Sequence, residues 1–124
     1  MAQAGKIARG QMAYHAGLAA EEQVLRHYQL AGHRICARRF RSAWGEIDLV
    51  LRNGDEVIFV EVKRGRSHAE AAERLSARQI GRIFNTALAY VANEPLGQNT
   101  PMRFDVALVD GMGRIEVLEQ ALAA

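Results

Sequence analysis

The segment of residues 45–66, "GEIDLVLRNGDEVIFVEVKRGR", limits the fold of this chain more than any other part. It consists of two alternating apolar runs joined by Asn53 and Gly54, which is the strongest short-range signal for a β-hairpin. With these two residues at the central positions of the turn, Arg52 faces Asp55 and the strands pair outward from there. The chain is therefore expected to contain an antiparallel pair of strands.

The acids of this hairpin are expected to gather at one end of one face. Side chains alternate along a strand, so Glu46, Asp48, Glu61 and Lys63 share a face, with Glu46 directly opposite Glu61. The other face is almost wholly apolar and carries Ile47, Leu49, Leu51, Ile58, Val60 and Val62. Facing carboxylates repel each other, so a basic side chain or a metal ion is expected between them. A one-residue slip, or a bulge near Gly45, would separate Asp48 from Glu61.

The remaining segments indicate an α/β protein. Helical spacing predicts a first helix over about residues 13–31, stopped by Gly32, and a second over about residues 76–92 after a polar loop. Strands are expected at residues 33–40, 103–109 and 114–119, which gives the order α-β-β-β-α-β-β. Because a helical crossover returns the chain parallel to an earlier strand, the predicted fold is a mixed sheet flanked by helices.

The first helix is expected to add an acid, Glu21, to a stripe that faces the core. At about 100° per residue Glu21 falls inside this stripe, whereas Glu22 falls on its flank. The stripe contains Gly17, Ala20, Val24, Tyr28 and Ala31, with Tyr14 and Leu25 at its edge. Such an acid destabilises the fold unless it is paired or binds a cation. The alternative is that Glu21 lies at the edge of the stripe and reaches water.

The composition suits a single domain, residues 1–124, with flexible ends over about residues 1–12 and 119–124. At 49% hydrophobic residues, the chain can bury a core without disulfides or a structural metal. A single cysteine, Cys36, and no signal peptide or long apolar run favour a reducing, cytoplasmic location. The histidines lack the spacing of a zinc site, and no phosphate-binding glycine loop is present, which argues against an NTPase.

The motifs resemble those of the small bacterial YraN-like proteins. "GEIDLV", "FVEVKRGR", a basic amphipathic helix and "RFDVALV" carry the likeness, which covers about residues 17–109. That family is similar in turn to the PD-(D/E)xK nuclease superfamily, above all to the archaeal Holliday-junction resolvases. The chain departs from these patterns at three positions. Ile47 stands where the superfamily motif has a proline. Ala20 stands where the YraN-like pattern has a second glycine before the helix glutamate, and Arg78 where a lysine is common near the start of the second helix.

The resemblance implies a restriction-endonuclease-like αβββαβ core and an endonuclease that hydrolyses DNA, including branched or structured DNA, with Mg²⁺ or Mn²⁺. It implies Glu21, Asp48, Glu61 and Lys63 as catalytic residues. Asp48, Glu61, the backbone carbonyl of Val62 and Glu21 would hold the metal, and Lys63 would orient or help to deprotonate the attacking water. Resolvase-like relatives imply a homodimer. The alternative is a nucleic-acid-binding or adaptor protein that keeps the fold without turnover.

Arginines in segments that border the acidic cluster are expected to contact DNA phosphates without reading sequence. They are Arg38, Arg39, Arg41, Arg64, Arg66, Arg78 and Arg82. For each one alone, a solvated surface position is the alternative. Glu46 is expected to support the acidic cluster or to pair with an arginine. Trp44 is expected to pack against the sheet, with stacking on a base as the alternative, and no membrane partner is expected.

Overall fold

The computed structural model describes the backbone of residues 2–121 and their side chains except those of residues 2–10, 13 and 14. Its elements are α1 (Ala2–Leu30), β1 (Arg34–Ser42), β2 (Gly45–Asn53), β3 (Glu56–Arg64), α2 (His68–Glu73), α3 (Ala77–Val91), a 3-10 turn (Gly97–Asn99), β4 (Met102–Val109) and β5 (Ile115–Leu118). The predicted α/β fold class is confirmed. Residues 1 and 122–124, within the ends predicted to be flexible, lie outside the described residues.

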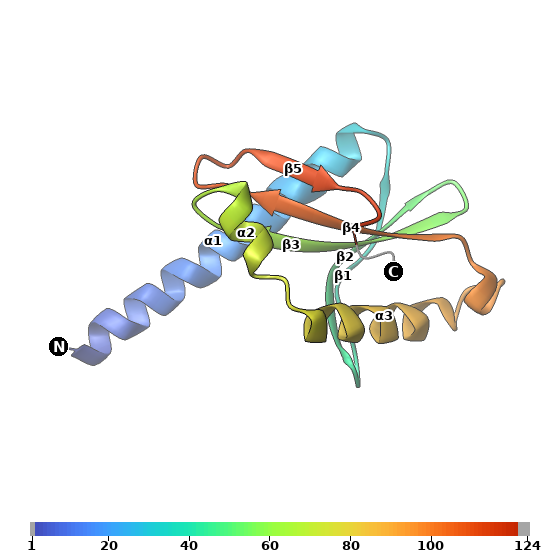
Figure 1. Ribbon diagram of the computed structural model, residues 1–124, viewed down its shortest axis with the longest axis horizontal. Coiled ribbons are helices and arrows are strands. Elements are labelled where there is room, and N and C mark those ends of the chain that lie inside the picture. Colours follow the sequence, from blue (N-terminus) through green and yellow to red (C-terminus); the bar gives the residue numbers. More distant parts are fainter. Residues whose placement is uncertain (1, 122–124) are drawn as a thin grey trace.

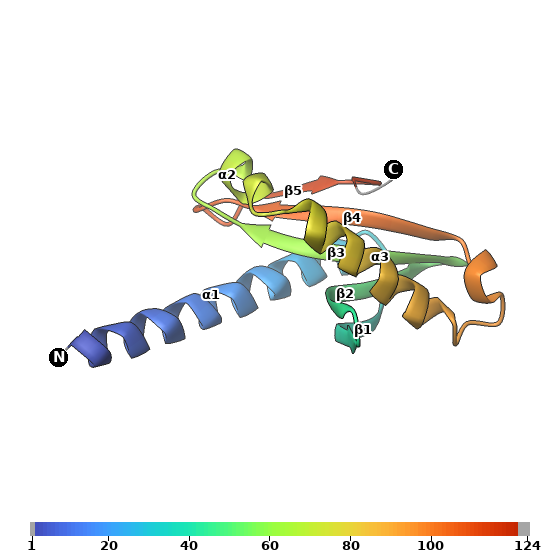
Figure 2. The same cartoon turned by 60° about the horizontal axis from the view of Figure 1, so that its bottom comes forward.

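The five strands form one mixed sheet in the order β1-β2-β3-β4-β5 (Figure 1). Tight turns make β1, β2 and β3 antiparallel neighbours, whereas β4 runs parallel to β3 after the crossover through α2 and α3. β5 then returns antiparallel along β4. α1 packs on one face of this sheet and α3 on the other (Figures 1 and 2). The predicted succession of three antiparallel strands, a crossover and a parallel strand is confirmed.

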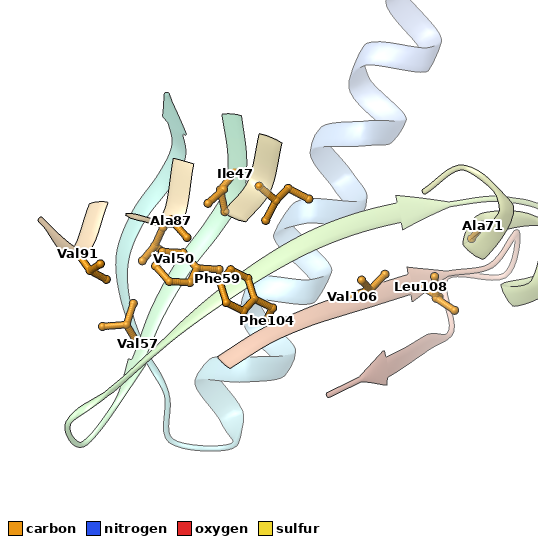
Figure 3. Packing of buried hydrophobic residues seen from close by; sticks show 11 residues of the cluster. Ile47, Val50, Val57, Phe59, Ala71, Ala87, Val91, Phe104, Val106 and Leu108 are labelled. Atoms are coloured by element: carbon orange, nitrogen blue, oxygen red, sulfur yellow. The ribbon is translucent and has the colours of Figure 1, made fainter. Parts of the chain in front are cut away.

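The core on the α3 face is built around aromatic rings (Figure 3). Phe59 of β3 stacks on Phe104 of β4 with 5.3 Å between ring centroids. From α3, Phe84 packs against Phe104 and Tyr90 against Phe59, at 4.5 and 5.8 Å between centroids. The helical spacing of the apolar residues in this helix predicts a buried face, which Ile83, Ala87 and Val91 confirm. Leu88, predicted on the same face, is 42% exposed instead.

The core on the α1 face takes the C-terminal half of that helix. The predicted stripe is confirmed for its buried members, Ala20, Val24, Leu25 and Tyr28. Ala31 is exposed instead, because the helix ends at Leu30, and the side chain of Tyr14 lies outside the described ones. Although α1 is long, neither it nor any other helix in the described part of the chain is apolar enough to cross a membrane.

A buried charge fixes the end of α1 to the sheet. The Asp105 carboxylate of β4 is fully buried, and the Tyr28 hydroxyl donates to its Oδ2 at 2.8 Å. Arg103 donates to both carboxylate oxygens at 3.0 Å, and the Gln120 N–H donates to Oδ1 at 3.3 Å. Because every oxygen of this buried carboxylate has a donor, the arrangement satisfies a group that would otherwise oppose folding.

Two helical segments differ from the prediction. α1 begins at Ala2 instead of about residue 13, and its N-terminal half projects beyond the sheet (Figure 1). Alanine, glutamine, lysine and methionine there favour a helix by propensity, which the apolar pattern does not report. α2 lies in the predicted loop and is capped by Ser67, whose hydroxyl accepts from the Glu70 N–H at 3.1 Å. Ser-x-x-Glu is the sequence signature of a capping box, so this start could have been predicted.

Gly65, where β3 leads into α2, leaves no room for a side chain. A Cβ at this position would lie 2.6 Å from the backbone nitrogen of Ala71. Gly65→Ala is therefore expected to lower the free energy of unfolding by about 1–3 kcal/mol, measured by denaturant titration, because backbone must shift. Gly81→Ala is the control, since its Cβ would meet nothing within 4 Å; it should be neutral or stabilising by up to about 1 kcal/mol. A Gly65→Ala protein as stable as the wild type would contradict this close packing.

Candidate active site

The β2–β3 hairpin has a register different from the predicted one. Asn53 faces Glu56, so the turn is centred one residue later, with Gly54 at its first central position and a φ of +61°. Glycine there is typical of a type II′ turn. Each β2 residue consequently faces a partner two positions further along β3, so the predicted pairing of Glu46 with Glu61 is wrong. Unlike a one-residue slip, a two-residue shift does not exchange the faces of the strands.

The ladder between β2 and β3 ends where the acids begin. Leu49 and Val60 are the last residues paired, so Asp48 lies level with Glu61, one step further. The Val62 N–H then donates to Asp48 Oδ2 at 2.8 Å, in place of a backbone carbonyl of β2. The strands therefore diverge at this point, and the Asp48 carboxylate lies in the fork between them.

A second irregularity crosses β1 and β2 at the same level. Arg39 and Asp48 lie opposite each other in that ladder, and Arg39 has a φ of +52°, a left-handed conformation uncommon for arginine. Alternation breaks in β2 as well, because Ile47 packs in the same core cluster as Val50, three residues later. The prediction that Ile47 shares the apolar face of Leu49 is therefore wrong.

A cavity of about 170 Å³ between α1 and the strand fork brings three of the four predicted catalytic residues together. Glu21, Asp48 and Lys63 line it, as does Val62. The remaining lining residues are Gly17, Ala20, Arg64 and Arg74. The choice of Glu21 over Glu22 from helical periodicity is confirmed, because their side chains are 12% and 49% exposed.

The fourth predicted residue, Glu61, is buried beside Asp48. Its Oε2 has no hydrogen-bond partner. Burial raises the pKa of Glu61 well above its usual range, and the hydrogen bond and the charge of Asp48 raise it further, whereas Lys63 lowers it. Two adjacent carboxylates, one with an unpaired oxygen, form an arrangement that a bound cation would stabilise.

Arginines of β1 already neutralise Glu21. Arg39 donates to Glu21 Oε2 from Nη2 at 2.9 Å and from Nε at 3.3 Å. Arg38 Nη2 lies 4.0 Å from the same oxygen, and its Nη1 pairs with Glu22 at 2.7 Å. The left-handed backbone of Arg39 occurs where β1 presents this guanidinium to α1, so the irregularity and the ion pair occur together.

The acids fit a hard divalent cation in part. Asp48 and Glu61 offer carboxylate oxygens, the ligands that Mg²⁺ and Mn²⁺ prefer, and the unpaired Glu61 oxygen is one ligand without a competing donor. Within the described residues, however, no three His, Cys, Asp or Glu side chains are grouped closely enough to hold a metal ion as they stand. Glu21 lines the same cavity as Asp48 but is bound to Arg39.

The arginines next to the acids are held in ion pairs. Arg41 Nε donates to Glu46 Oε2 at 2.7 Å, which confirms the arginine partner predicted for Glu46. Arg66 Nε donates to Glu70 Oε2 at 3.0 Å. Arg64 lines the cavity beside Asp48. Of these three residues, Arg64 therefore borders the candidate site, and the contact of all three with DNA stays a prediction.

A second basic surface lies on α3 near the β1–β2 turn. Arg78 and Arg82 are exposed, and no carboxylate of the described residues lies within 4.0 Å of either guanidinium. A Cβ on Gly45 would lie 3.3 Å from Arg82 Cβ, so α3 contacts the turn between β1 and β2. Trp44 in that turn is 59% exposed, so its predicted packing against the sheet is wrong. Arg74, the C-cap residue of α2, lines the cavity of the candidate site but was not predicted there. The reason is that the segment of α2 was predicted to be a loop.

Comparisons with known proteins point to one family. The model of the family described as "Uncharacterised protein family UPF0102" matches residues 20–109. A UPF0102 protein of Cereibacter sphaeroides is 58% identical over 115 residues, which cover 93% of this chain and 98% of that protein. Those of Ruegeria pomeroyi and Dinoroseobacter shibae are 56% and 46% identical over 113 and 111 residues, covering 91% and 90% of this chain and 92% and 83% of theirs. The matched range contains all four predicted catalytic residues.

Proposed function

The chain belongs to the UPF0102 family, which confirms the predicted YraN-like relationship, and we propose that it is a divalent-metal-dependent endonuclease that hydrolyses phosphodiester bonds of DNA. One observation carries this proposal: the strand fork places Asp48 beside the buried, incompletely paired Glu61 and in one cavity with Lys63 and Glu21. Carboxylates can hold the metal ion for hydrolysis of a phosphodiester, and a neighbouring lysine can stabilise the charge that develops on the phosphate.

Each of these residues has a role in the proposed reaction. Asp48, Glu61 and the backbone carbonyl of Val62 would hold Mg²⁺ or Mn²⁺, which would lower the pKa of a water and supply positive charge for the phosphate. Lys63 orients the attacking water and stabilises the negative charge that develops on the phosphate oxygens. Glu21 accepts a hydrogen bond from that water or joins the metal ligands.

In this proposal Glu21 can take part in the reaction only after its ion pair with Arg39 opens. Their two hydrogen bonds must open before the carboxylate can turn to a cation. Once released, the Arg39 guanidinium can donate to a phosphate oxygen, the ligand that its planar fork matches. Substrate and metal would thus be bound together, because each takes one member of the ion pair. This exchange supports an enzyme whose site is completed by its substrate.

The surrounding arginines support a substrate held by its phosphates. Arg64 and Arg74 line the cavity, and Arg78 and Arg82 are exposed on α3; contacts of such arginines with phosphates position DNA without reading its sequence. Branched or structured DNA and a homodimer remain part of the proposal by analogy with the resemblance described above. A cytoplasmic location remains part of it because of the single cysteine.

A non-catalytic DNA-binding or adaptor protein is the second candidate. The observation that favours it is that Glu21 is bound to Arg39 and that the described residues contain no group of three acids arranged for a metal. In this alternative the ion pair is permanent and the arginines alone contact DNA.

Cleavage assays distinguish the two candidates. Purified protein is incubated with linear duplex, flap and four-way-junction DNA in Mg²⁺ or Mn²⁺, with Ca²⁺ and a chelator as controls and Asp48→Asn as the matched variant. Cutting that needs Mg²⁺ or Mn²⁺ and is lost in Asp48→Asn is the expected result, because the amide removes the charge that holds the cation. DNA binding by both proteins without cutting in any metal would support the adaptor instead.

A further inference from the structure

A cavity of about 540 Å³ opens directly beside the candidate active site. The two cavities share Ala20, Arg64 and Arg74 in their linings. On one side the larger cavity is walled by α1, and on the other by α2 and the turn between β4 and β5, which lie side by side in Figures 1 and 2. A ligand that extends from the acidic site therefore enters this cavity next.

The charge of this cavity suits an anion. Arg64, Arg66 and Arg74 contribute guanidiniums to its lining. Glu70 lies between two of them, accepting from Arg66 Nε at 3.0 Å and from Arg74 Nη2 at 3.4 Å. The carboxylate thereby holds two arginines at one place, and a phosphate can replace it there, since guanidinium binds both anions through the same fork.

The second acid of the lining is already neutralised. Asp110 Oδ1 accepts from the backbone N–H of Met112 at 2.9 Å and of Arg114 at 2.8 Å, and its Oδ2 accepts from Arg114 Nε at 2.9 Å. Its side chain is only 7% exposed. The charge that this cavity presents to a ligand is consequently positive.

The walls leave the backbone and small side chains facing the cavity. α1 contributes Ala16 and Ala19, and the turn contributes Gly111 and Gly113. The turn is fixed, because the Gly111 N–H donates to the Arg66 carbonyl at 3.3 Å. Gln23 of α1 also lines the cavity, and its Nε2 would lie 3.4 Å from a Cβ on Gly113.

An apolar side chain stands at the rim. Met112, which is 81% exposed, lines the cavity from the tip of the same turn. A thioether there offers a polarisable surface to the face of a base. The cavity thus combines groups for phosphate with one for a base.

From these observations we propose that the cavity binds an unpaired nucleic-acid strand as it leaves the candidate active site. A volume of this size is that of a small-ligand pocket and admits about one or two nucleotides, far less than a duplex requires. The proposal rests on the endonuclease function for the path of the strand, and it assigns the substrate class: DNA with an unpaired segment next to the scissile phosphate.

Fluorescence anisotropy in Ca²⁺ or chelator, where no cutting occurs, tests the proposal. A labelled unpaired oligonucleotide is compared with a duplex of the same sequence. Arg74→Ala should weaken binding of the unpaired strand by at least about 10-fold and reduce the slope of log affinity against log salt by about 1. Glu70→Gln should strengthen this binding several-fold, because it removes the competing carboxylate.

Two further variants separate shape from charge. Ala19→Trp fills the cavity from an exposed helix position without changing charge, and it should weaken binding of the unpaired strand by at least about 10-fold while duplex binding is unchanged. Arg34→Ala is the control: it also removes one positive charge, but from the exposed start of β1, opposite Arg52 near the far end of β2. Its binding should match the wild type.

The outcomes separate this proposal from the endonuclease function. If Ala19→Trp and Arg74→Ala bind the unpaired strand like the wild type and metal-dependent cutting is intact, strand binding in the cavity is contradicted but the endonuclease function is not. If binding changes as expected but the wild-type protein cuts no DNA, strand binding in the cavity is supported and the endonuclease function is contradicted. Displacement of the oligonucleotide by polyglutamate as efficiently as by unlabelled oligonucleotide would overturn the proposal in favour of an acidic peptide.

Discussion

Replacing Glu61 with glutamine is expected to abolish DNA cleavage and at the same time to make the metal-free protein more stable. The substitution keeps the shape of a buried side chain but removes the carboxylate that is pressed against Asp48 without a partner for Oε2. The amide can donate to Asp48, so the free energy of unfolding in a chelator should rise by about 1–3 kcal/mol. The cleavage rate should fall by at least about 100-fold, because the proposed metal site loses one of its carboxylates.

The two readouts together identify what Glu61 does. Denaturant titration in chelator gives the stability, and a cleavage assay in Mg²⁺ or Mn²⁺ gives the rate. Glu116→Gln is the control, because it changes a half-exposed glutamate whose carboxylate lies 3.1 Å from His68 at the surface; both readouts should stay near the wild type. A Glu61→Gln protein that is less stable than the wild type in chelator would show that the carboxylate supports the fold instead of the site.

Asp105→Ala is expected to lower the free energy of unfolding by about 3–5 kcal/mol. The carboxylate is fully buried and receives hydrogen bonds from Tyr28, Arg103 and Gln120. Its removal leaves the Arg103 guanidinium, only 16% exposed, without its main partner and the Tyr28 hydroxyl without an acceptor. Thermal and denaturant unfolding measure the loss.

A matched control shares the same arginine. Glu56 lies 3.6 Å from Arg103 Nη1 but is 36% exposed, so Glu56→Ala should lower the free energy of unfolding by no more than about 1 kcal/mol. Equal losses in Asp105→Ala and Glu56→Ala would contradict a special role for the buried carboxylate.

The Tyr28 hydroxyl adds a dependence on pH. Burial raises the pKa of Tyr28 above its usual value, and the negative charge and hydrogen bond of Asp105 raise it further. Above about pH 10 the unfolded chain loses the tyrosine proton while the folded chain keeps it, so stability falls as the pH rises beyond that value. Tyr28→Phe should show a smaller fall, to which Tyr90, whose pKa burial also raises, still contributes. The variant should be less stable at neutral pH by about 1.5–3 kcal/mol. A wild-type curve parallel to that of Tyr28→Phe above pH 10 would contradict this coupling.

The fold could be predicted from the sequence because its signals are local. An alternating pattern around Asn53 and Gly54 defines β2 and β3, and 3.6-residue spacing defines α3 and the packed half of α1. The register was wrong because an Asn-Gly pair does not determine which residues occupy the centre of the turn. The error did not by itself separate Asp48 from Glu61, because a shift of two residues does not exchange the faces of the strands.

The sequence predicted which residues form the candidate site, but it did not predict the contacts that these residues make. Periodicity selected Glu21, and the hairpin selected Asp48, Glu61 and Lys63. No local pattern indicated that Arg39 would adopt a left-handed backbone or bind Glu21, because both depend on how α1 crosses β1. The apolar pattern gave no indication of the arginine from α2, since a helix of six residues has too few turns to show a period.

The irregularity at Arg39 and Asp48 constrains how this chain can change in length. It occurs at matching positions of two paired strands, so the outer part of the hairpin keeps Phe40 and Ile47 inward together. Deleting one residue from a single strand would turn its outer half over, exposing an apolar side chain and burying a polar one. Insertions and deletions in the β1–β2 hairpin should therefore be tolerated as compensating pairs, one in each strand. Changes in the length of β1 near Arg39 should accompany changes in the length of β2 near Asp48 among related sequences.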